Sequence, residues 1–444
     1  MTPPPAETQW LARAAAATPE AVALVEDDGT AITYGELDAL ADEAAARVRD
    51  TVGVSSGDIT VVAVNSVGTP LVAMLWGAWR IGVVPLMIDQ RSPLVRDWGS
   101  AARKPWEMEL SPTAPPGRLH TVVLTSGSTV GARPVRLTHR NVAAAVAASQ
   151  ERLANDATDR WLLTLPLFHV GALSILWRSA AVGGTVVIHE EFDAARSAGA
   201  MKDGSVTIAS LVPTMLHRIL DVDPGPYHGM RGVLLGGAAA NQGLVEGGLD
   251  AGLPILQTYG MTEACSQIAT VAPGEEAESL GTAGRPLDGM EVTIDGSDVG
   301  EIIIDGAAVS PGYLGEPDRE GGHRTRDLGY FDDAGRLVVL GRADDMVVTG
   351  GENVYPQRVA DVLSRHRFVQ RVEVVGVPDA EWGQALVAIV VGDGTTRRRV
   401  ERWAQERLAR HEVPKEWVFV EELPLLAGGK VDRAALQELA RHAL

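Results

Sequence analysis

The interpretation of the whole chain depends on the stretch Thr121 to Thr138, TVVLTSGSTVGARPVRLT. An apolar run of β type, Thr121 to Leu124, leads into small hydroxylated residues and glycines, and Arg133 and Arg136 follow with positive charge. Glycine permits tight turns, small neighbours let backbone N–H groups approach a ligand, and hydroxyl and guanidinium groups donate to phosphate oxygens. The stretch therefore predicts a clasp for a nucleotide polyphosphate, although a flexible linker has a similar composition. It lacks the Gly-Lys-Ser/Thr triplet of a Walker loop.

Length and composition indicate a soluble globular protein. The 444 residues favour two to three domains, and 45% hydrophobic with 22% charged residues is an ordinary balance. The formal net charge is −19, from 39 Lys and Arg against 58 Asp and Glu. This acidic balance argues against nucleic acid or an anionic membrane as the main partner. An anionic small ligand would need a locally basic site.

Cysteine content and the N-terminus point to the cytoplasm. Cys265 is the single cysteine, which excludes an internal disulfide and fits a reducing compartment; we expect it to be a small core residue. The first twenty residues, MTPPPAETQWLARAAAATPE, lack the basic start and unbroken apolar core of a signal peptide. No uncharged apolar run reaches the roughly 18 residues of a membrane span. We therefore expect no membrane insertion, and a homo-oligomer is compatible with the sequence.

Apolar strands and helices alternate over the first 290 residues. This alternation predicts an α/β fold with mostly parallel sheets. We expect strands at 21–26, 31–34, 58–65, 82–87, 121–124, 161–165, 185–189, 206–211, 231–235 and 254–258, and helices at 7–17, 34–49, 70–81, 138–148 and 171–181. Thr138 is the expected N-cap of its helix. Motifs follow the strand ends at Leu124, Leu165, Leu235 and Thr258, which is where open α/β sheets bind ligands.

After about Glu291 the sequence pattern changes to short strands and turns, which predicts a β-rich subdomain. The hydrophilic break Gly341-Arg342-Ala343-Asp344-Asp345 then precedes a smaller unit with strands at 372–377 and 385–391 and helices at 356–366 and 396–408. We place a domain boundary at this break. The expected domains are residues 1–343 and residues 344–444.

Six ordered motifs carry a resemblance over most of the chain. They are TSGSTVGARPV, LLGGAAA, QTYGMTE, RTRDLGYFDDAGRLVVLGRADD, VTGGENVYP and LAGGKVDR. Together they resemble the adenylate-forming superfamily of acyl-CoA synthetases and related ligases. The resemblance implies a large N-terminal α/β domain and a small mobile α+β C-terminal domain. It also implies that ATP and Mg²⁺ convert a carboxylic acid to an acyl-adenylate, whose acyl group passes to coenzyme A.

The resemblance also implies roles for residues of the nucleotide site. The hydroxyl-rich loop would hold the β- and γ-phosphates, and Tyr259 would offer its ring to the adenine. Thr262 would contact the α-phosphate, and Glu263 would hold Mg²⁺, which prefers oxygen ligands. Asp327 would accept hydrogen bonds from both ribose hydroxyls, with Arg342 in support. The full expected ATP and AMP set is Thr125, Ser126, Gly127, Ser128, Thr129, Arg133, Gly236, Gly237, Ala238, Thr258, Tyr259, Gly260, Met261, Asp327 and Arg342.

Further roles follow from the same resemblance. Lys430 would stabilise the reacting carboxylate and α-phosphate as a mobile point charge, and His169 would lie at the acyl pocket. Asp344 matches the hinge about which the small domain reorients. That reorientation would bring the loop Gly350, Gly351 and Glu352 to the side where coenzyme A binds.

The clasp departs from the family pattern TSG[ST]TGxPKG at three positions. Val130 stands at the usual glycine, Ala132 at the usual proline and Arg133 at the usual lysine. Valine is poorly suited to positive φ, so Gly131 would have to take over the turn. Arg133 keeps the positive charge.

The runs PLFHVGALSILWRSAAVGGTVVIHEEFD, LVPTMLHRIL and QTYGMTEACSQIAT resemble the o-succinylbenzoate–CoA ligase branch of menaquinone biosynthesis. Such a substrate has two carboxylates and an aromatic ketone, so its pocket needs polar groups, and Arg178, Ser266 and Gln267 are the candidates. Alternatives stay open. They are another aryl- or acyl-CoA ligase of secondary metabolism, an enzyme that loads a carrier protein, and a nucleotide-binding relative without catalysis.

Overall fold

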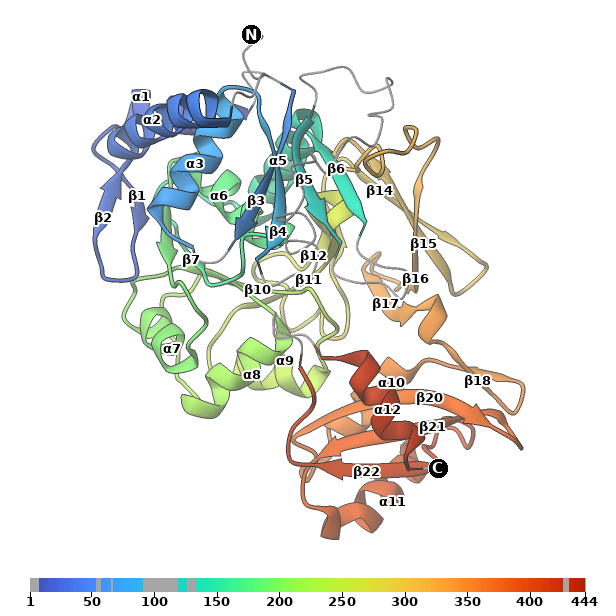
Figure 1. The fold of residues 1–444 in the computed structure, drawn as a ribbon. Coiled ribbons are helices and arrows are strands. Elements are labelled where there is room, and N and C mark those ends of the chain that lie inside the picture. Colours follow the sequence, from blue (N-terminus) through green and yellow to red (C-terminus); the bar gives the residue numbers. More distant parts are fainter. Residues whose placement is uncertain are drawn as a thin grey trace.

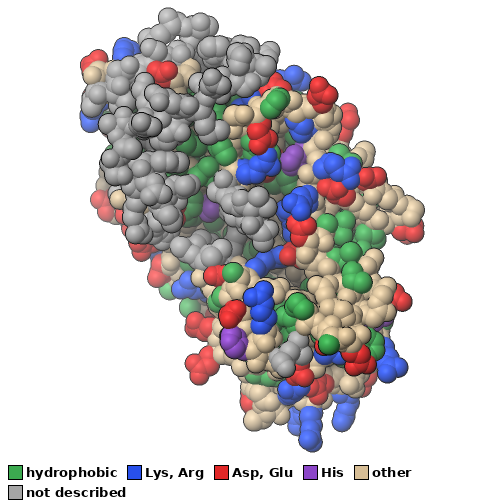
Figure 2. All heavy atoms as spheres, turned by 45° about the vertical axis from the view of Figure 1, so that its right-hand side comes forward, with side chains coloured by type: hydrophobic (Ala, Val, Ile, Leu, Met, Phe, Trp, Pro, Cys, Tyr) green, Lys and Arg blue, Asp and Glu red, His purple; other side chains and the backbone are tan. Residues whose placement is uncertain are grey.

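The computed structural model describes residues 8–52, 57–64, 67–90, 119–125, 133–425 and 431–443. Figure 1 shows a large body, from blue to light orange, above a smaller C-terminal unit in orange and red. No helix among these residues combines the length and the apolar character that crossing a membrane requires. Acidic and basic side chains intermix over the described part of the face that Figure 2 shows.

A nine-stranded sheet forms the centre of the large body, and its strands are parallel from β11 to β1, which confirms the expected mostly parallel sheet. Every residue of β8, β9 and β10 is buried, as expected for strands covered on both faces. The strand order is β13 (Arg285–Pro286), β12 (Ser266–Thr270), β11 (Ile255–Met261), β10 (Gly232–Leu235), β9 (Ile208–Leu211), β7 (Arg160–Leu163), β8 (Thr185–Ile188), β1 (Val22–Val25) and β2 (Ala31–Thr33).

Helices cover both faces of this sheet because side chains alternate between faces along each strand. Trp161 of β7 packs into one core with α1, α3, α5 and α6, and its neighbour Leu162 packs into a second core with α7, α8 and α9. The helices are α1 (Trp10–Ala17), α2 (Tyr34–Val52), α3 (Thr69–Arg80), α5 (His139–Leu153), α6 (Val170–Val182), α7 (Ala194–Lys202), α8 (Pro213–Val222) and α9 (Gln242–Asp250). Thr138 caps α5 as predicted, within a capping box with Asn141.

A second sheet has the order β3 (Ile59–Val64), β4 (Val84–Asp89), β5 (Leu119–Leu124) and β6 (Pro134–Thr138). The last pair is antiparallel, so the end of the predicted clasp, from Pro134 onward, is a strand and not part of a loop. The intervening residues 126–132 lie outside the described residues.

The predicted β-rich subdomain is an antiparallel four-stranded sheet. Its order is β14 (Met290–Asp295), β15 (Gly300–Gly306), β16 (His323–Phe331) and β17 (Leu337–Arg342), and the 3₁₀ turn η3 (Ala343–Asp345) follows it.

The C-terminal unit has its own five-stranded sheet and a separate core on each face. Its strands are β18 (Val347–Thr349), β19 (Glu352–Val354), β20 (Arg371–Asp379), β21 (Gly383–Val391) and β22 (Glu416–Val420). Helices α10 (Pro356–Ser364) and α11 (Arg397–Arg407) belong to one core, and α12 (Arg433–Arg441) belongs to the other. This mixed α+β arrangement agrees with the expected fold of the C-terminal part.

Candidate active site

Three of the four predicted motifs share one edge of the nine-stranded sheet. Strands β7, β10 and β11 are mutually parallel, so their carboxyl ends deliver His169, Gly236 and Tyr259 to the same edge. The fourth motif follows β5, which belongs to the second sheet. The candidate site therefore lies where two sheets meet.

The predicted end of a strand at Thr258 is wrong, because β11 continues through Met261 and folds back as β12. The turn η2 (Thr262–Ala264) joins the two strands, and Cys265 and Ser266 follow with φ of 52° and 105°. Such left-handed conformations in residues with side chains are strained and cluster at functional sites. Gly260 is required here, because a Cβ at that position would overlap the backbone of Ser266. The hairpin therefore presents Thr262 and Glu263 at its tip.

A tyrosine and an arginine hold the carboxylate of Asp327. The hydroxyl of Tyr259 donates to Oδ2 at 2.6 Å, and Nε of Arg342 lies 3.5 Å from Oδ1. Asp327 and Arg342 are direct partners across β16 and β17. Burial raises the pKa of Asp327, and Tyr259 and Arg342 partly oppose that shift. The carboxylate is thus oriented from both sides, and the hydroxyl of Tyr259 is committed to it.

The segment between β15 and β16 holds Glu263. The hydroxyl of Tyr313 donates to Oε1 at 2.8 Å, and the backbone N–H of Ser310 donates to the carbonyl of Glu263 at 2.7 Å. In the described part of the chain, no group of three or more His, Cys, Asp or Glu side chains could hold a metal alone. A Mg²⁺ ion at Glu263 would therefore need phosphate oxygens and water as further ligands, which is its usual preference.

Thr125 and Arg133 join at the base of the predicted clasp. The N–H of Thr125 donates to the carbonyl of Arg133 at 2.9 Å, and the N–H of Arg133 donates to Oγ1 of Thr125 at 3.0 Å. The guanidinium of Arg133 lies 3.3 Å from the ring centroid of Tyr313 and 2.7 Å from Glu316. Ser126, Gly127, Ser128, Thr129, Val130, Gly131 and Ala132 lie outside the described residues.

The loop after β10 begins in close contact with β11. A Cβ on Gly236 would lie 2.6 Å from Cγ2 of Thr258, so only glycine permits this approach, and Gly237 has φ +76°. The hydroxyl of Thr258 donates to the carbonyl of Ala269 at 3.0 Å. Gly237 and Ala238 are exposed beside this edge, as the predicted flank of an adenine requires.

The predicted acyl-pocket residues combine α6 with β12. His169 is the N-cap residue of α6, and its ring centroid lies 4.6 Å from that of Phe168. Arg178 is 3% exposed, and its Nε and Nη2 find no hydrogen-bond partner among the described residues. Burial lowers the pKa of Arg178 to about 9. The guanidinium lies 5.6 Å from the ring centroid of Trp161, and no Asp or Glu of the described residues forms an ion pair with it.

Two neighbours on the β11–β12 hairpin accompany Arg178. Burial raises the pKa of the Cys265 thiol, and the charge of Arg178 partly opposes that shift. Gln267 is buried, and its Nε2 donates to Oγ1 of Thr270 at 2.8 Å. Its Oε1 has no described partner, while Ser266 is only half-buried.

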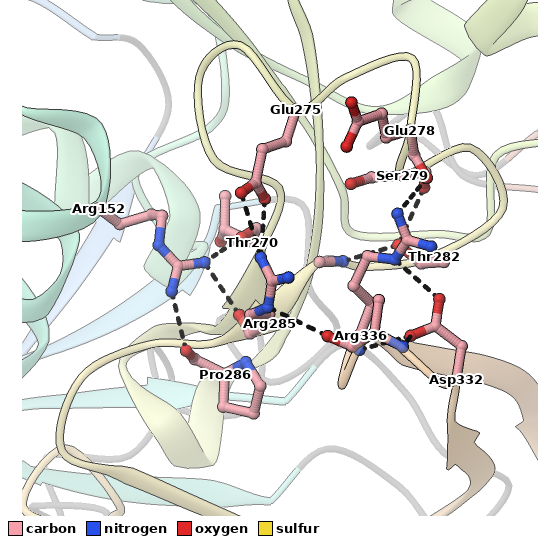
Figure 3. A network of polar contacts seen from close by, with 12 residues as sticks. Arg152, Thr270, Glu275, Glu278, Ser279, Thr282, Arg285, Pro286, Asp332 and Arg336 are labelled. Atoms are coloured by element: carbon pink, nitrogen blue, oxygen red, sulfur yellow. Dashed lines mark hydrogen bonds and ion pairs between the residues drawn. The ribbon is translucent and has the colours of Figure 1, made fainter.

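Arg152 of α5 fixes the far end of β12 (Figure 3). Its guanidinium donates to the carbonyls of Thr270, of Arg285 at 3.0 Å and of Pro286 at 2.9 Å. Arg285 in turn bonds both carboxylate oxygens of Glu275 at 3.1 Å. This network ties the strand that carries Gln267 to the helix that begins after β6.

Charged pairs surround the predicted hinge. Asp344 pairs with Arg326 at 2.8 Å, and Asp345 pairs with Arg433 of the C-terminal unit. Burial lowers the pKa of Arg433, the charge of Arg342 lowers it further, and the charge of Asp327 opposes the shift. Lys430 lies outside the described residues.

The expected coenzyme A loop is a tight hairpin. Gly350 and Gly351 have φ of +60° and +88° and form the two-residue turn between β18 and β19, with exposed Glu352 directly after them. The N–H of Gly350 donates to the carbonyl of Trp382 at 3.0 Å, and Nζ of Lys415 lies 4.2 Å from the Trp382 ring centroid.

Sequence reasoning missed Tyr313, Trp382 and Lys415. Tyr313 lies in the run Ser-Pro-Gly-Tyr between two strands, a turn signal that carried no prediction. The contacts that make all three residues relevant come from segments far apart in the sequence.

Comparisons with known proteins identify the family of this chain. The AMP-binding enzyme family model matches residues 11–97 and 92–314, and the model of the AMP-binding enzyme C-terminal domain matches residues 358–430. The 2-succinylbenzoate–CoA ligase of Bacillus licheniformis is 40% identical over 333 residues, which are 71% of this chain and 69% of that protein. The corresponding ligase of Listeria innocua is 37% identical over 344 residues, 76% and 73% of the two chains.

Solved structures of o-succinylbenzoate CoA synthetase are also similar to this chain. The o-succinylbenzoate CoA synthetase of Bacillus subtilis in complex with the acyl-adenylate intermediate OSB-AMP superposes with a TM-score of 0.83 at 30% identity, covering 98% of this chain and 99% of that one. Its complex with ATP and magnesium ion has a TM-score of 0.82 at 29% identity, covering 99% of both chains.

Proposed function

This chain belongs to the AMP-binding enzyme family, and we propose that it uses ATP and Mg²⁺ to activate 2-succinylbenzoate and then transfers the acyl group to coenzyme A. The observation that carries the proposal is a pair of oriented carboxylates, one on β16 and one at the tip of the β11–β12 hairpin. Asp327 is held by Tyr259 and Arg342, and Glu263 is held by Tyr313. The names of the ligases that this chain resembles support the substrate.

The first half-reaction forms a bond between a carboxylate oxygen of the acid and the α-phosphorus of ATP, and pyrophosphate leaves. Two anions must approach each other, so oriented donors and positive charge lower the barrier. Thr262 would donate to the α-phosphate, Asp327 would accept from the ribose, and Lys430 would neutralise charge at the reacting centre. Mg²⁺ bound at Glu263 would neutralise phosphate charge. The donor set fits this ion, since one carboxylate leaves room for phosphate ligands.

Arg178 would bind the carboxylate of the substrate that is not activated. Burying the guanidinium of Arg178 without a partner among the described residues is unfavourable in free energy. An anionic group of the substrate would offset this desolvation. Oε1 of Gln267, which has no partner among the described residues, would accept a hydrogen bond from a donor in the same pocket. His169 and Ser266 would line the entrance.

In the second half-reaction, the thiol sulfur of coenzyme A attacks the acyl carbonyl carbon and AMP leaves. We assign this step to the face of the C-terminal unit that carries Gly350 and Gly351. Trp382 offers an aromatic surface beside this turn, and Lys415 places a cation over its ring. An adenine and a phosphate of coenzyme A would suit such a pair.

We also propose two domains, residues 1–343 and 344–444, with Asp344 as the hinge. The separate sheet and cores of the C-terminal unit support this division. A location in the cytoplasm is proposed on the acidic composition and the single cysteine.

The test supplies the purified protein with ATP, Mg²⁺, coenzyme A and 2-succinylbenzoate, and measures AMP and the thioester by mass spectrometry. Parallel reactions use benzoate, other aryl and acyl acids, and a phosphopantetheinylated carrier protein in place of coenzyme A. If only another acid is turned over, the assignment of 2-succinylbenzoate as substrate is wrong. If only the carrier protein is acylated, the assignment of coenzyme A as acceptor is wrong. ATP binding without any AMP would indicate a relative without catalysis.

A further inference from the structure

Tyr313 touches both halves of the nucleotide site. It lies in the segment between β15 and β16, and its hydroxyl donates to Oε1 of Glu263 at 2.8 Å. Its ring supports the guanidinium of Arg133, which closes the base of the clasp, at 3.3 Å from the ring centroid. One half-buried side chain thus joins the carboxylate expected to hold Mg²⁺ to the loop expected to hold the phosphates.

The segment that carries Tyr313 is anchored to β6. Arg136 is 3% exposed and pairs with Asp318 at 3.0 Å, and its guanidinium also donates to the carbonyls of Pro311 at 3.3 Å and Pro317 at 3.4 Å. The hydroxyl of Ser310 donates to the carbonyl of Arg136 at 2.7 Å. Arg136 therefore holds this segment, and its charge is engaged there and not in the clasp.

A direct backbone bridge continues this anchoring beside the tyrosine. Val135 pairs with Tyr313 as an isolated antiparallel bridge, and the N–H of Leu314 donates to the carbonyl of Pro134 at 2.8 Å. The backbone of Tyr313 is consequently fixed relative to β6, the strand that follows the clasp.

From these contacts we propose that Tyr313 is a positioning residue that holds Glu263 for Mg²⁺ and couples it to the base of the phosphate clasp. This inference rests on the proposed function of the site. The hydroxyl occupies Oε1, and Oε2 has no hydrogen bond from the described residues, so the second oxygen is left for a metal.

The same arrangement accounts for arginine at a position where the family pattern has lysine. The planar guanidinium of Arg133 stacks on the ring of Tyr313 and at the same time pairs with Glu316 at 2.7 Å. A lysine ammonium has neither the planar face nor the fork of donors. Arg133 therefore stiffens the base of the clasp in addition to contributing charge.

The test compares Tyr313→Phe, which removes only the hydroxyl, with Tyr313→Leu, which also removes the ring. Calorimetric titration with ATP, with and without Mg²⁺, isolates the metal-dependent part of the ATP affinity. The titration contains no carboxylic acid substrate, so it does not depend on which acid the enzyme activates. We expect Tyr313→Phe to weaken that part about tenfold, as the loss of a hydrogen bond to a charged group does, and to leave metal-free ATP binding unchanged. Tyr313→Leu should weaken metal-free ATP binding as well.

Tyr330→Phe removes a hydroxyl from β16 and serves as the matched control. The kinetic readout is the Mg²⁺ concentration for half-maximal adenylation, which should rise for Tyr313→Phe while kcat recovers at saturating Mg²⁺. Unchanged Mg²⁺ dependence, or an equal loss with and without Mg²⁺, would overturn the proposal. Failure of the wild-type protein to form an adenylate would instead overturn the proposed function. The binding titration would still test the role of Tyr313, because it requires no catalysis.

Discussion

The hydroxyl of Tyr259 lies 2.6 Å from Oδ2 of Asp327, 68 residues further along the chain. This bond joins the nine-stranded sheet to the antiparallel sheet of the β-rich subdomain. Tyr259 therefore has two expected roles: its hydroxyl orients Asp327, and its ring would contact the adenine. Asp327 must hold its charge in a buried place, and the hydrogen bond from the neutral phenol of Tyr259 stabilises that charge.

Tyr259→Phe should therefore weaken nucleotide binding while leaving the aromatic face in place. We expect KM for ATP to rise about tenfold or more, because a hydrogen bond to a charged group contributes roughly 1.5–3 kcal/mol. Steady-state kinetics measure the change. Tyr227→Phe is the control, since that hydroxyl donates to the backbone carbonyl of Asp223 on the other core. An equal rise in both variants would show a general loss of stability.

The same variant should shift the acid limb of the pH profile. The ionised form of Asp327 accepts the ribose hydroxyls, so ATP binding weakens as pH falls through its pKa, which burial already raises. The Tyr259 bond lowers that pKa, so its removal moves the limb to higher pH. The pH dependence of kcat/KM for ATP measures the shift. A limb that stays in place or moves to lower pH contradicts this account.

Arg178→Met should separate substrate recognition from stability. We expect KM for 2-succinylbenzoate to rise on the order of tenfold to a hundredfold, because a desolvated ion pair is lost. Thermal stability should be unchanged or higher, since an unpaired buried charge is removed. Turnover of a monocarboxylate such as benzoate, where measurable, is the internal control. An equal loss with both acids would place Arg178 outside the acid pocket.

Lys430→Ala should affect the two half-reactions unequally. We expect adenylation to fall on the order of a hundredfold or more, because a charge at the transition state is lost. Transfer from a preformed adenylate to coenzyme A should be much less affected, since under the proposed reorientation about Asp344 the lysine would act only in the first half-reaction. Single-turnover assays of each half-reaction test this. Equal losses in both would contradict domain alternation about Asp344.

Glu373 on β20 should make the C-terminal unit less stable at higher pH. Burial raises the pKa of Glu373 from 4.5 to about 7, so the folded state binds this proton more tightly than the unfolded state does. The corresponding stability is complete below pH 4.5 and is lost as pH rises through about 7. Glu373→Gln should remove this dependence, which amounts to at most about 3 kcal/mol. Urea unfolding between pH 5 and pH 8 measures it, and parallel curves for both proteins would refute it.

Local patterns in the sequence determined much of this protein. Apolar periodicity located the strands and the longer helices, because the buried face of each element recurs at a short, regular spacing along the sequence. Thr138 predicted its helix start because a cap acts within three residues. The ordered motifs predicted the family that the comparisons show. The helices α7, α8 and α9 were not predicted, since short helices owe their stability to packing.

Only the tertiary structure decided how those motifs meet. The sequence interpretation ended β11 at Thr258, whereas pairing with β12 extends it and places Glu263 on a hairpin tip. It treated Arg133 and Arg136 alike, whereas one stacks on Tyr313 and the other is buried against Asp318. A sequence shows which side chains can donate, accept or carry charge. Their partners lie tens to hundreds of residues away, so the packing of sheets selects which pairs form.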